Sequence, residues 1–121
     1  MFDWPRPVVH FEIRARDKEK LTAFYRELFE WNMQEQAAVP ITLIAPGKGP
    51  PEQGIAGHII ENAAAPGVAI YVQVADLAAS LRKAGELGGR ATAQPFDVPG
   101  GHTTIAQIAD PEGNLIGLIQ M

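Results

Sequence analysis

The stretch VVHFEIRARDKEKLTAFYRELF, residues 8–29, holds a strand pattern followed directly by a helix pattern. Apolar and polar side chains alternate over residues 7–13, which predicts a strand with one partly polar face. Asp17 is a typical N-cap residue, and the apolar residues after it recur with helical spacing. The sequence therefore predicts an amphipathic helix whose apolar stripe lies in the core, and the residues of that stripe are Leu21, Phe24, Tyr25, Leu28 and Phe29.

The remainder of the first half contains three further strand patterns. They cover residues 31–38, 41–45 and 54–61. A loop rich in proline and glycine, residues 46–54, separates the last two, because this composition disfavours both a helix and an inner strand. Residues 62–67 are typical of a linker.

The second half repeats this order of elements. A strand pattern over residues 68–74 precedes Asp76, a second N-cap residue, and Gly88 with Gly89 predicts a left-handed end to the helix. Three strands are expected after it, and a tight turn of the Pro-Glu-Gly type joins the last two. The strands cover residues 90–94, 102–109 and 114–120, and the turn covers residues 110–113.

The spacing of equivalent residues indicates an internal duplication. Asp17 and Asp76 lie 59 residues apart, while Gly57 and Gly117 lie 60 apart. A period of half the chain is typical of a duplicated supersecondary unit. The predicted fold class is therefore α+β, with tandem βαβββ modules in a mixed sheet and both helices on one face. Module one is expected at about residues 6–61 and module two at about residues 67–121.

Composition limits the function classes. At 121 residues, one domain with one hydrophobic core is expected. A net charge of −4 without a run of Lys or Arg argues against nucleic acid and anionic membranes as partners. The chain has no cysteine, and the sequence shows neither a secretion signal nor an apolar membrane span. A cytoplasmic location is the resulting expectation.

Three segments resemble the vicinal oxygen chelate superfamily, the group of glyoxalases, bleomycin-resistance proteins and extradiol dioxygenases. They are VVHFEI with DxxKLxxFYxELF at residues 8–29, VQVAD at 72–76 and ADPEGNLIGLIQ at 109–120. The resemblance implies a glyoxalase/bleomycin-resistance/dioxygenase fold, in which the curved sheet forms a half-barrel with the helices on its convex face. It also implies a small-molecule ligand in the concave cavity, and often a divalent metal ion there.

The resemblance places metal ligands on the first and last strands of each module. His10 fits the first-strand position of module one, so it is the candidate metal ligand. The equivalent positions hold Ala69, Gly117 and, in the first module, Gly57, none of which can coordinate a metal. A shift of one residue would replace Gly57 by His58. The usual site of four ligands is therefore incomplete. The resemblance still leaves a divalent metal ion as the one candidate cofactor.

Polar residues on the expected concave face are the candidate site residues. His10 and Glu12 could act as an acid–base pair, with Tyr71 as a hydrogen-bond donor that positions the substrate. The alternatives are a strand histidine bonded to a neighbour and a buried ion pair. Candidate ligand-binding residues on the same face or at its rim are Gln73, His58, His102, Thr104 and Gln107, although His58 also fits a sheet or interface histidine, and His102 an exposed loop histidine.

The leading hypothesis is a glyoxalase- or dioxygenase-like protein that binds a small molecule and has lost most metal ligands. If it is an enzyme, we expect a lyase, isomerase or dioxygenase acting on vicinal oxygens or an enolisable carbonyl. The first alternative is sequestration of a drug or metabolite, as in bleomycin-resistance proteins, which needs no reactive group. The second alternative is a module that serves only for protein interaction. A homodimer is the expected assembly.

Overall fold

The structure, a computed structural model, forms two compact units. One unit spans residues 10–68, and the other combines the N-terminal segment up to Val9 with residues 69–121. Each module contains one helix and four strands in the order βαβββ, as the sequence predicted. The residues described are 4–37, 39–49, 53–62, 66–98 and 103–120.

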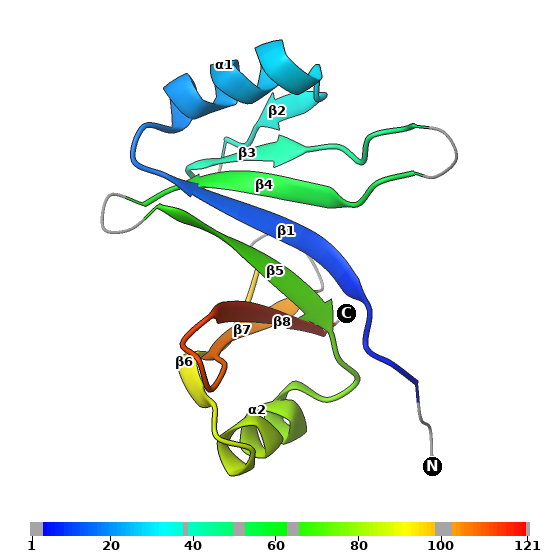
Figure 1. The fold of residues 1–121 in the computed structure, drawn as a ribbon, viewed down its shortest axis with the longest axis vertical. Helices are drawn as coiled ribbons and strands as arrows, with labels where there is room; N and C mark the ends of the chain where they lie inside the picture. The colour runs from blue at the N-terminus through cyan, green and yellow to red at the C-terminus, as the bar shows by residue number, and fades with distance from the viewer. Residues whose placement is uncertain (1–3, 38, 50–52, 63–65, 99–102, 121) are drawn as a thin grey trace. The chain divides into compact units, whose positions relative to one another are not determined.

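Module one is a mixed four-stranded sheet with a helix on one face (Figure 1). Its strand order is β2-β3-β4-β1, in which β1 and β4 are parallel and the other neighbours are antiparallel. The parallel pair requires a crossover connection, which α1 begins. The elements are β1 (Val8–Ala15), α1 (Lys18–Phe29), β2 (Met33–Glu35), β3 (Ile41–Ile44) and β4 (Ala56–Glu61).

Both ends of α1 have clear local causes. The Asp17 side chain accepts a hydrogen bond from the Lys20 backbone N–H at 3.1 Å, which confirms it as the N-cap. Glu30 ends the helix in the left-handed conformation, at φ 57°, and its N–H bonds to the Arg26 carbonyl at 3.0 Å. The core under the helix consists of Ile13, Ala15, Ile44 and Ile59, with Phe11, Leu21, Tyr25, Trp31 and Met33 packed against it.

The predicted core stripe of α1 is partly wrong. Phe24 is 55% exposed and Leu28 is 57% exposed. The helix is rotated so that the buried positions are Lys18 and Thr22, together with the half-buried Leu21 and Tyr25. These four positions are spaced as one helical face. Apolar side chains alone therefore do not define the face that α1 turns to its sheet.

Hydrogen bonds that join buried polar side chains of α1 to Thr42 and to the exposed Glu35 accompany this rotation. The Lys18 ammonium donates to the Glu35 carboxylate at 2.6 Å, and the Thr42 hydroxyl donates to the other Glu35 oxygen at 2.8 Å. The Thr22 hydroxyl donates to Thr42 at 3.3 Å. The hydrogen bond from Lys18 is the main reason that the pKa of Glu35 is lowered. Because the polar groups on α1 find partners in the sheet, their burial carries little penalty.

Module two repeats the arrangement. Its strand order is β5-β8-β7-β6, with β5 and β8 parallel. The Asp76 side chain accepts from the Ala79 N–H at 3.0 Å, and Gly88 follows the helix with φ 101°, as predicted. Leu77 and Leu81 of the helix pack on Val74, Ala106 and Leu118. The elements are β5 (Gly67–Gln73), α2 (Leu77–Glu86), β6 (Arg90–Asp97), β7 (Thr104–Ala109) and β8 (Leu115–Gln120).

These modules confirm the predicted fold class of tandem βαβββ units with mixed strand pairing. In each, the helix lies on one face of its own sheet, and the opposite face is not covered by that helix (Figure 1). Neither helix of the described chain is long and apolar enough to cross a membrane.

Gly57 offers a test of packing on the helix side of module one. A Cβ atom at this position would lie 2.5 Å from the Phe11 ring. We expect Gly57→Ala to lower the free energy of unfolding by about 1–3 kcal/mol, because the ring must leave its place against β4. Urea denaturation measures the change. Gly47→Ala is the matched control, since a Cβ there meets nothing within 4 Å, and an equal effect of both substitutions would contradict the packing argument.

Candidate active site

A row of ionisable side chains occupies the face of module one that is turned away from α1. Phe11, Ile13 and Ala15 of β1 point to the helix side, so the alternate residues His10, Glu12 and Arg14 point to the other side. On the neighbouring strand β4, His58 is paired in register with Glu12. The polar face predicted for the first strand is therefore extended by one histidine from β4 and one arginine from β1.

The histidines and the carboxylate form a continuous hydrogen-bonded chain. His10 Nε2 lies 2.7 Å from His58 Nδ1, and His58 Nε2 lies 3.2 Å from Glu12 Oε1. Glu12 is only 4% exposed. We call these three hydrogen-bonded side chains, Glu12, His58 and His10, the acid–base row.

The tautomers of the acid–base row follow from its partners. An ionised Glu12 can only accept, so His58 carries its proton on Nε2 and its lone pair on Nδ1. His10 must then donate from Nε2, which makes His10 Nδ1 its basic nitrogen. A proton received at Nδ1 can be balanced by transfer of the Nε2 proton to His58 and of the His58 proton to Glu12. The arrangement can therefore take up a proton at one end and stabilise it at the other.

His10 is neutral at physiological pH. Its pKa is lowered from 6.5 to about 4, mainly by burial and then by the neighbouring His58, while the Glu12 charge raises it. A histidine with this pKa is present as the free base at pH 7. The low value makes His10 a weak base.

Arg14 is a member of the site that the sequence did not identify. Its Nε lies 3.9 Å from Glu12 Oε2, and its side chain is 18% exposed. The guanidinium lies close to Gly67, where a Cβ would be 2.6 Å from Arg14 Nη2. A period of two along β1 after His10 and Glu12 is the signal that could have placed Arg14 on this face. No comparable sequence pattern predicts that position 67, which lies against the Arg14 guanidinium, must be a glycine.

A hollow of about 290 Å³ lies beside His10. This volume is at the lower end of the range for small-molecule sites. The hollow combines an imidazole and carboxamides with apolar side chains, and its described lining is His10, Asn32, Gln34, Leu43, Ile44, Ala45, Pro46, Ala56 and Gly57. A ligand there can reach one end of the acid–base row.

A larger hollow of about 910 Å³ involves the helix side of module one. Its walls include Phe11, Phe29 and Trp31, and the ring centroids of the last two are 5.1 Å apart. No residue of the acid–base row lines it among the residues described. We place the candidate active site at the smaller hollow because that is where the acid–base groups lie.

Module two carries different groups on the face turned away from its helix. Val72 packs on the α2 side, so Tyr71 and Gln73 point to the opposite side. Gln107 Nε2 donates to the Tyr71 hydroxyl at 3.4 Å, and Tyr71 is 4% exposed. The Tyr71 ring lies against Gly117, where a Cβ would meet it at 2.4 Å. Tyr71 and Gln107 thus form a polar pair within this module.

The remaining predicted residues do not join these groups. Thr104 donates to Asp97 at 2.8 Å, and it lies on the same side of β7 as Ala106, which packs under α2. The prediction of Thr104 on the concave face is therefore not supported by its position. His102 lies outside the described residues.

The assignment of the last-strand position in module one is corrected. Gly57 is paired with Phe11 and lies beneath its ring on the helix side, whereas His58 lies beside His10. The offset of 59 residues given by the helix caps makes His58 equivalent to Gly117, and His10 to Ala69. The offset of 60 derived from the two glycines is out by one, and one residue reverses the face in a strand.

The donor set of module one does not fit a metal ion as it is arranged. Two imidazole nitrogens bound to one ion at about 2.0–2.1 Å lie about 3.3 Å apart in tetrahedral geometry. The 2.7 Å between His10 and His58 instead requires a shared proton. Over the part of the chain that is described, no three His, Asp or Glu side chains are placed to hold an ion. The row is arranged for hydrogen bonding.

Comparison with known proteins agrees with the sequence resemblance. Residues 10–119 match the family described as a glyoxalase-like domain. A protein of Vibrio cholerae named as a probable lactoylglutathione lyase is 31% identical over 126 aligned positions, covering 93% of this chain and 89% of its own length.

Solved structures share the fold at low identity. A hypothetical protein of Bacillus halodurans superposes with a TM-score of 0.65 at 12% identity, covering 96% of this chain and 94% of the other. A methylmalonyl-CoA epimerase of Streptomyces coelicolor, solved with 2-nitronate-propionyl-CoA, gives 0.62 at 15% identity, with 94% and 93% covered. With the family match over most of the sequence, the chain belongs to the glyoxalase-like domain family of the vicinal oxygen chelate superfamily.

Proposed function

We propose that this protein is an enzyme that moves a proton at a carbon next to a carbonyl group, with His10 as the base. The observation that carries the proposal is the hydrogen-bonded order His10, His58, Glu12 at 2.7 and 3.2 Å, beside a hollow of about 290 Å³. A positioned base backed by an orienting histidine and carboxylate is the usual construction for general acid–base catalysis. The names lyase and epimerase borne by similar proteins support the same class of chemistry.

The step balances without another reactant. His10 Nδ1 takes the proton of the Cα–H bond, and the bond's electron pair forms a carbon–carbon double bond while the carbonyl oxygen takes the negative charge. The Glu12 charge favours the imidazolium that results, but burial and the neighbouring His58 outweigh it and keep the pKa of His10 at about 4. Return of the proton from His10 to the same face restores the substrate or exchanges its proton with solvent, whereas a proton delivered from water to the opposite face of the same carbon gives the epimer.

The low pKa of His10 limits the substrate. A base with a pKa of about 4 abstracts a proton efficiently only from a carbon acid that is itself activated. A substrate with a carbonyl group on each side of the reacting carbon meets this requirement, because both carbonyl oxygens share the charge of the enolate. We therefore propose a β-dicarbonyl compound as the substrate class.

Module two is proposed to bind ligand oxygen through its own polar pair. The Tyr71 hydroxyl is a donor and acceptor, and Gln107 already holds it by a hydrogen bond. Gln73 lies on the same face. We also propose that the protein forms a homodimer, and analytical ultracentrifugation would measure the mass of the assembly.

Solvent exchange tests the proposed reaction. In deuterium oxide, the protein should speed loss of the α-proton signal of a panel of β-dicarbonyl compounds, followed by proton NMR. His10→Gln should lower this rate by about 10²–10⁴-fold, the usual contribution of a positioned base. Lys83→Gln, an exposed change on α2, is the control and should leave the rate unchanged.

Two results would contradict the proposal. Exchange that is unaffected by His10→Gln would remove His10 as the base. If the protein binds these compounds saturably but does not speed exchange of their α-protons, the result would instead favour the sequestration alternative.

A further inference from the structure

The exposed side of α1 carries a groove that the acid–base row does not use. It consists of two adjoining hollows of about 430 and 510 Å³, which share Lys20 and Phe24. The first hollow begins at the turn between β1 and α1, and the second reaches Leu28. At 1.5 Å per helical residue, the groove runs about 12 Å along α1 from Lys20 to Leu28.

The floor of the groove is apolar although it faces solvent. Phe24 and Leu28 are 55% and 57% exposed, and Leu21 contributes from the buried side. Adjoining exposed apolar side chains with a polar rim are typical of binding surfaces. Their position on one face of a helix gives the floor a linear shape.

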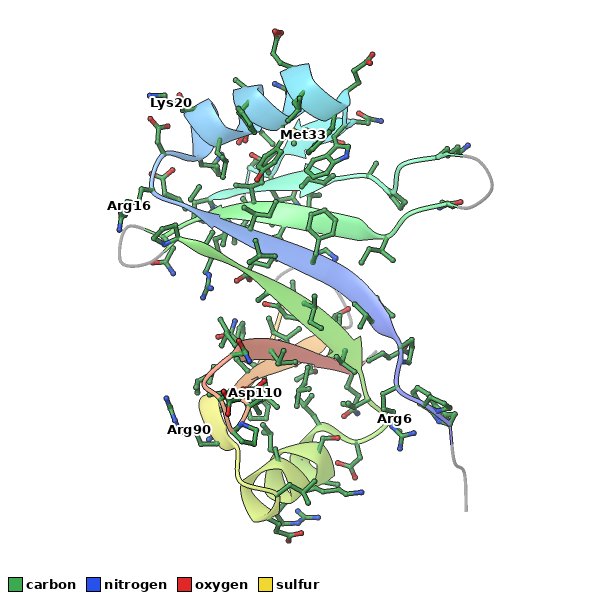
Figure 2. The ribbon with its side chains drawn as sticks, viewed as in Figure 1. Arg6, Arg16, Lys20, Met33, Arg90 and Asp110 are labelled. Carbon is green, nitrogen blue, oxygen red and sulfur yellow. The ribbon has the colours of Figure 1, made fainter. Side chains whose placement is uncertain are left out.

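Charge is concentrated at one end of the groove. Arg14, Arg16 and Lys20 line the first hollow, in a protein whose net charge is −4. Figure 2 shows the labelled side chains of Arg16 and Lys20 at the same end of α1. Asp17 is the one acidic residue of this hollow, so its described lining carries three positive charges and one negative charge. The other acidic residue of the groove, Glu27, lies in the second hollow.

We propose that this groove binds a free amphipathic carboxylate of medium chain length, such as a fatty acid of about ten carbons, matched to the groove length of about 12 Å. The carboxylate lies between Arg16 and Lys20, since Arg14 is already engaged with Glu12 at 3.9 Å. The alkyl chain lies along Phe24 and ends at Leu28. The proposal does not depend on the proposed reaction.

The combination of charge and apolar floor selects this ligand. Opposite charge at the head positions the molecule, whereas burial of the chain supplies most of the affinity, at about 25 cal/mol per Å² of apolar surface. A short anion lacks the chain, and a neutral alcohol lacks the charge. Both should therefore bind more weakly than the fatty carboxylate.

Titration calorimetry of the full chain with decanoate, kept below its micelle concentration, tests the site. We expect saturable binding of one molecule per chain. Arg16→Gln with Lys20→Gln should weaken it about 10-fold or more, as should Leu28→Ser, because each removes about 1.4 kcal/mol or more of interaction. Decanol should bind at least about 10-fold more weakly and acetate not measurably.

The matched control is Arg82→Gln with Lys83→Gln, which removes two positive charges from α2 and should not change the affinity. The proposal is overturned if decanoate does not saturate, or if decanol binds equally well. Binding to vesicles of phosphatidylglycerol without binding to free decanoate would show a membrane surface instead. A dimer that Leu28→Ser dissociates, with no decanoate binding, would show that a second copy covers the groove.

Discussion

Glu12→Ala is expected to lower the free energy of unfolding by about 3–5 kcal/mol, the largest stability loss of any single side chain in the acid–base row. Glu12 is 4% exposed and faces Arg14 at 3.9 Å and His58 at 3.2 Å. Its removal leaves the half-buried guanidinium without its carboxylate. Urea denaturation at pH 7 measures the effect.

Two further variants separate charge from packing. Glu12→Gln combined with Arg14→Met removes both charges together and should recover a large part of the loss. Glu27→Ala, an exposed acidic position on α1, should change the stability by no more than about 0.5 kcal/mol. A Glu12→Ala protein as stable as the Glu27→Ala protein would show that the ion pair is not buried in solution.

The second large effect is a dependence of stability on pH that belongs to His10. Its folded-state pKa of about 4 lies below the unfolded value of 6.5, so the unfolded chain binds the proton first as the pH falls. The contribution is therefore fully present above pH 6.5 and is lost as the pH falls through about 4. This pKa difference corresponds to about 3 kcal/mol.

His10→Gln isolates this contribution, because glutamine does not titrate in this range. The stability difference between the two proteins should change by about 3 kcal/mol between pH 7 and pH 4, in the direction that favours the variant at low pH. Denaturation curves at a series of pH values measure it. A constant difference across this window would mean that His10 titrates alike in both states.

Local sequence patterns were sufficient for the parts of the fold that depend on near neighbours. Asp17 and Asp76 were recognised as helix caps because an N-cap acts within three residues. His10 and Glu12 were placed on one face of a strand because side chains alternate with a period of two. Both inferences needed no knowledge of distant contacts.

Register between strands could not be obtained in this way. The pairing of β4 with β1 decides whether position 57 or position 58 faces His10, and forty residues connect the two strands. The two glycines at positions 57 and 117 suggested one register, while the helix caps suggested another. A slip of one residue exchanges the two faces of a strand, so this small error assigned the last-strand ligand position to Gly57 instead of His58.

The orientation of α1 was missed for a different reason. An apolar stripe predicts the buried face of a helix only where the sheet offers apolar partners. Here Thr42 and Glu35 bind Lys18 and Thr22, so two polar positions are buried, and three large apolar residues of the predicted stripe, Phe24, Leu28 and Phe29, are exposed. Such pairing joins residues about twenty positions apart and is invisible to a helical pattern.

The duplication described above has left the two copies chemically unequal. At the offset of 59, Glu12 and Arg14 correspond to Tyr71 and Gln73, and His10 to Ala69. One copy thus carries an imidazole, a carboxylate and a guanidinium, while its twin has a methyl group, a phenol and a carboxamide at the same three positions. On the proposed function, a change of reaction would therefore have to arise in the first copy.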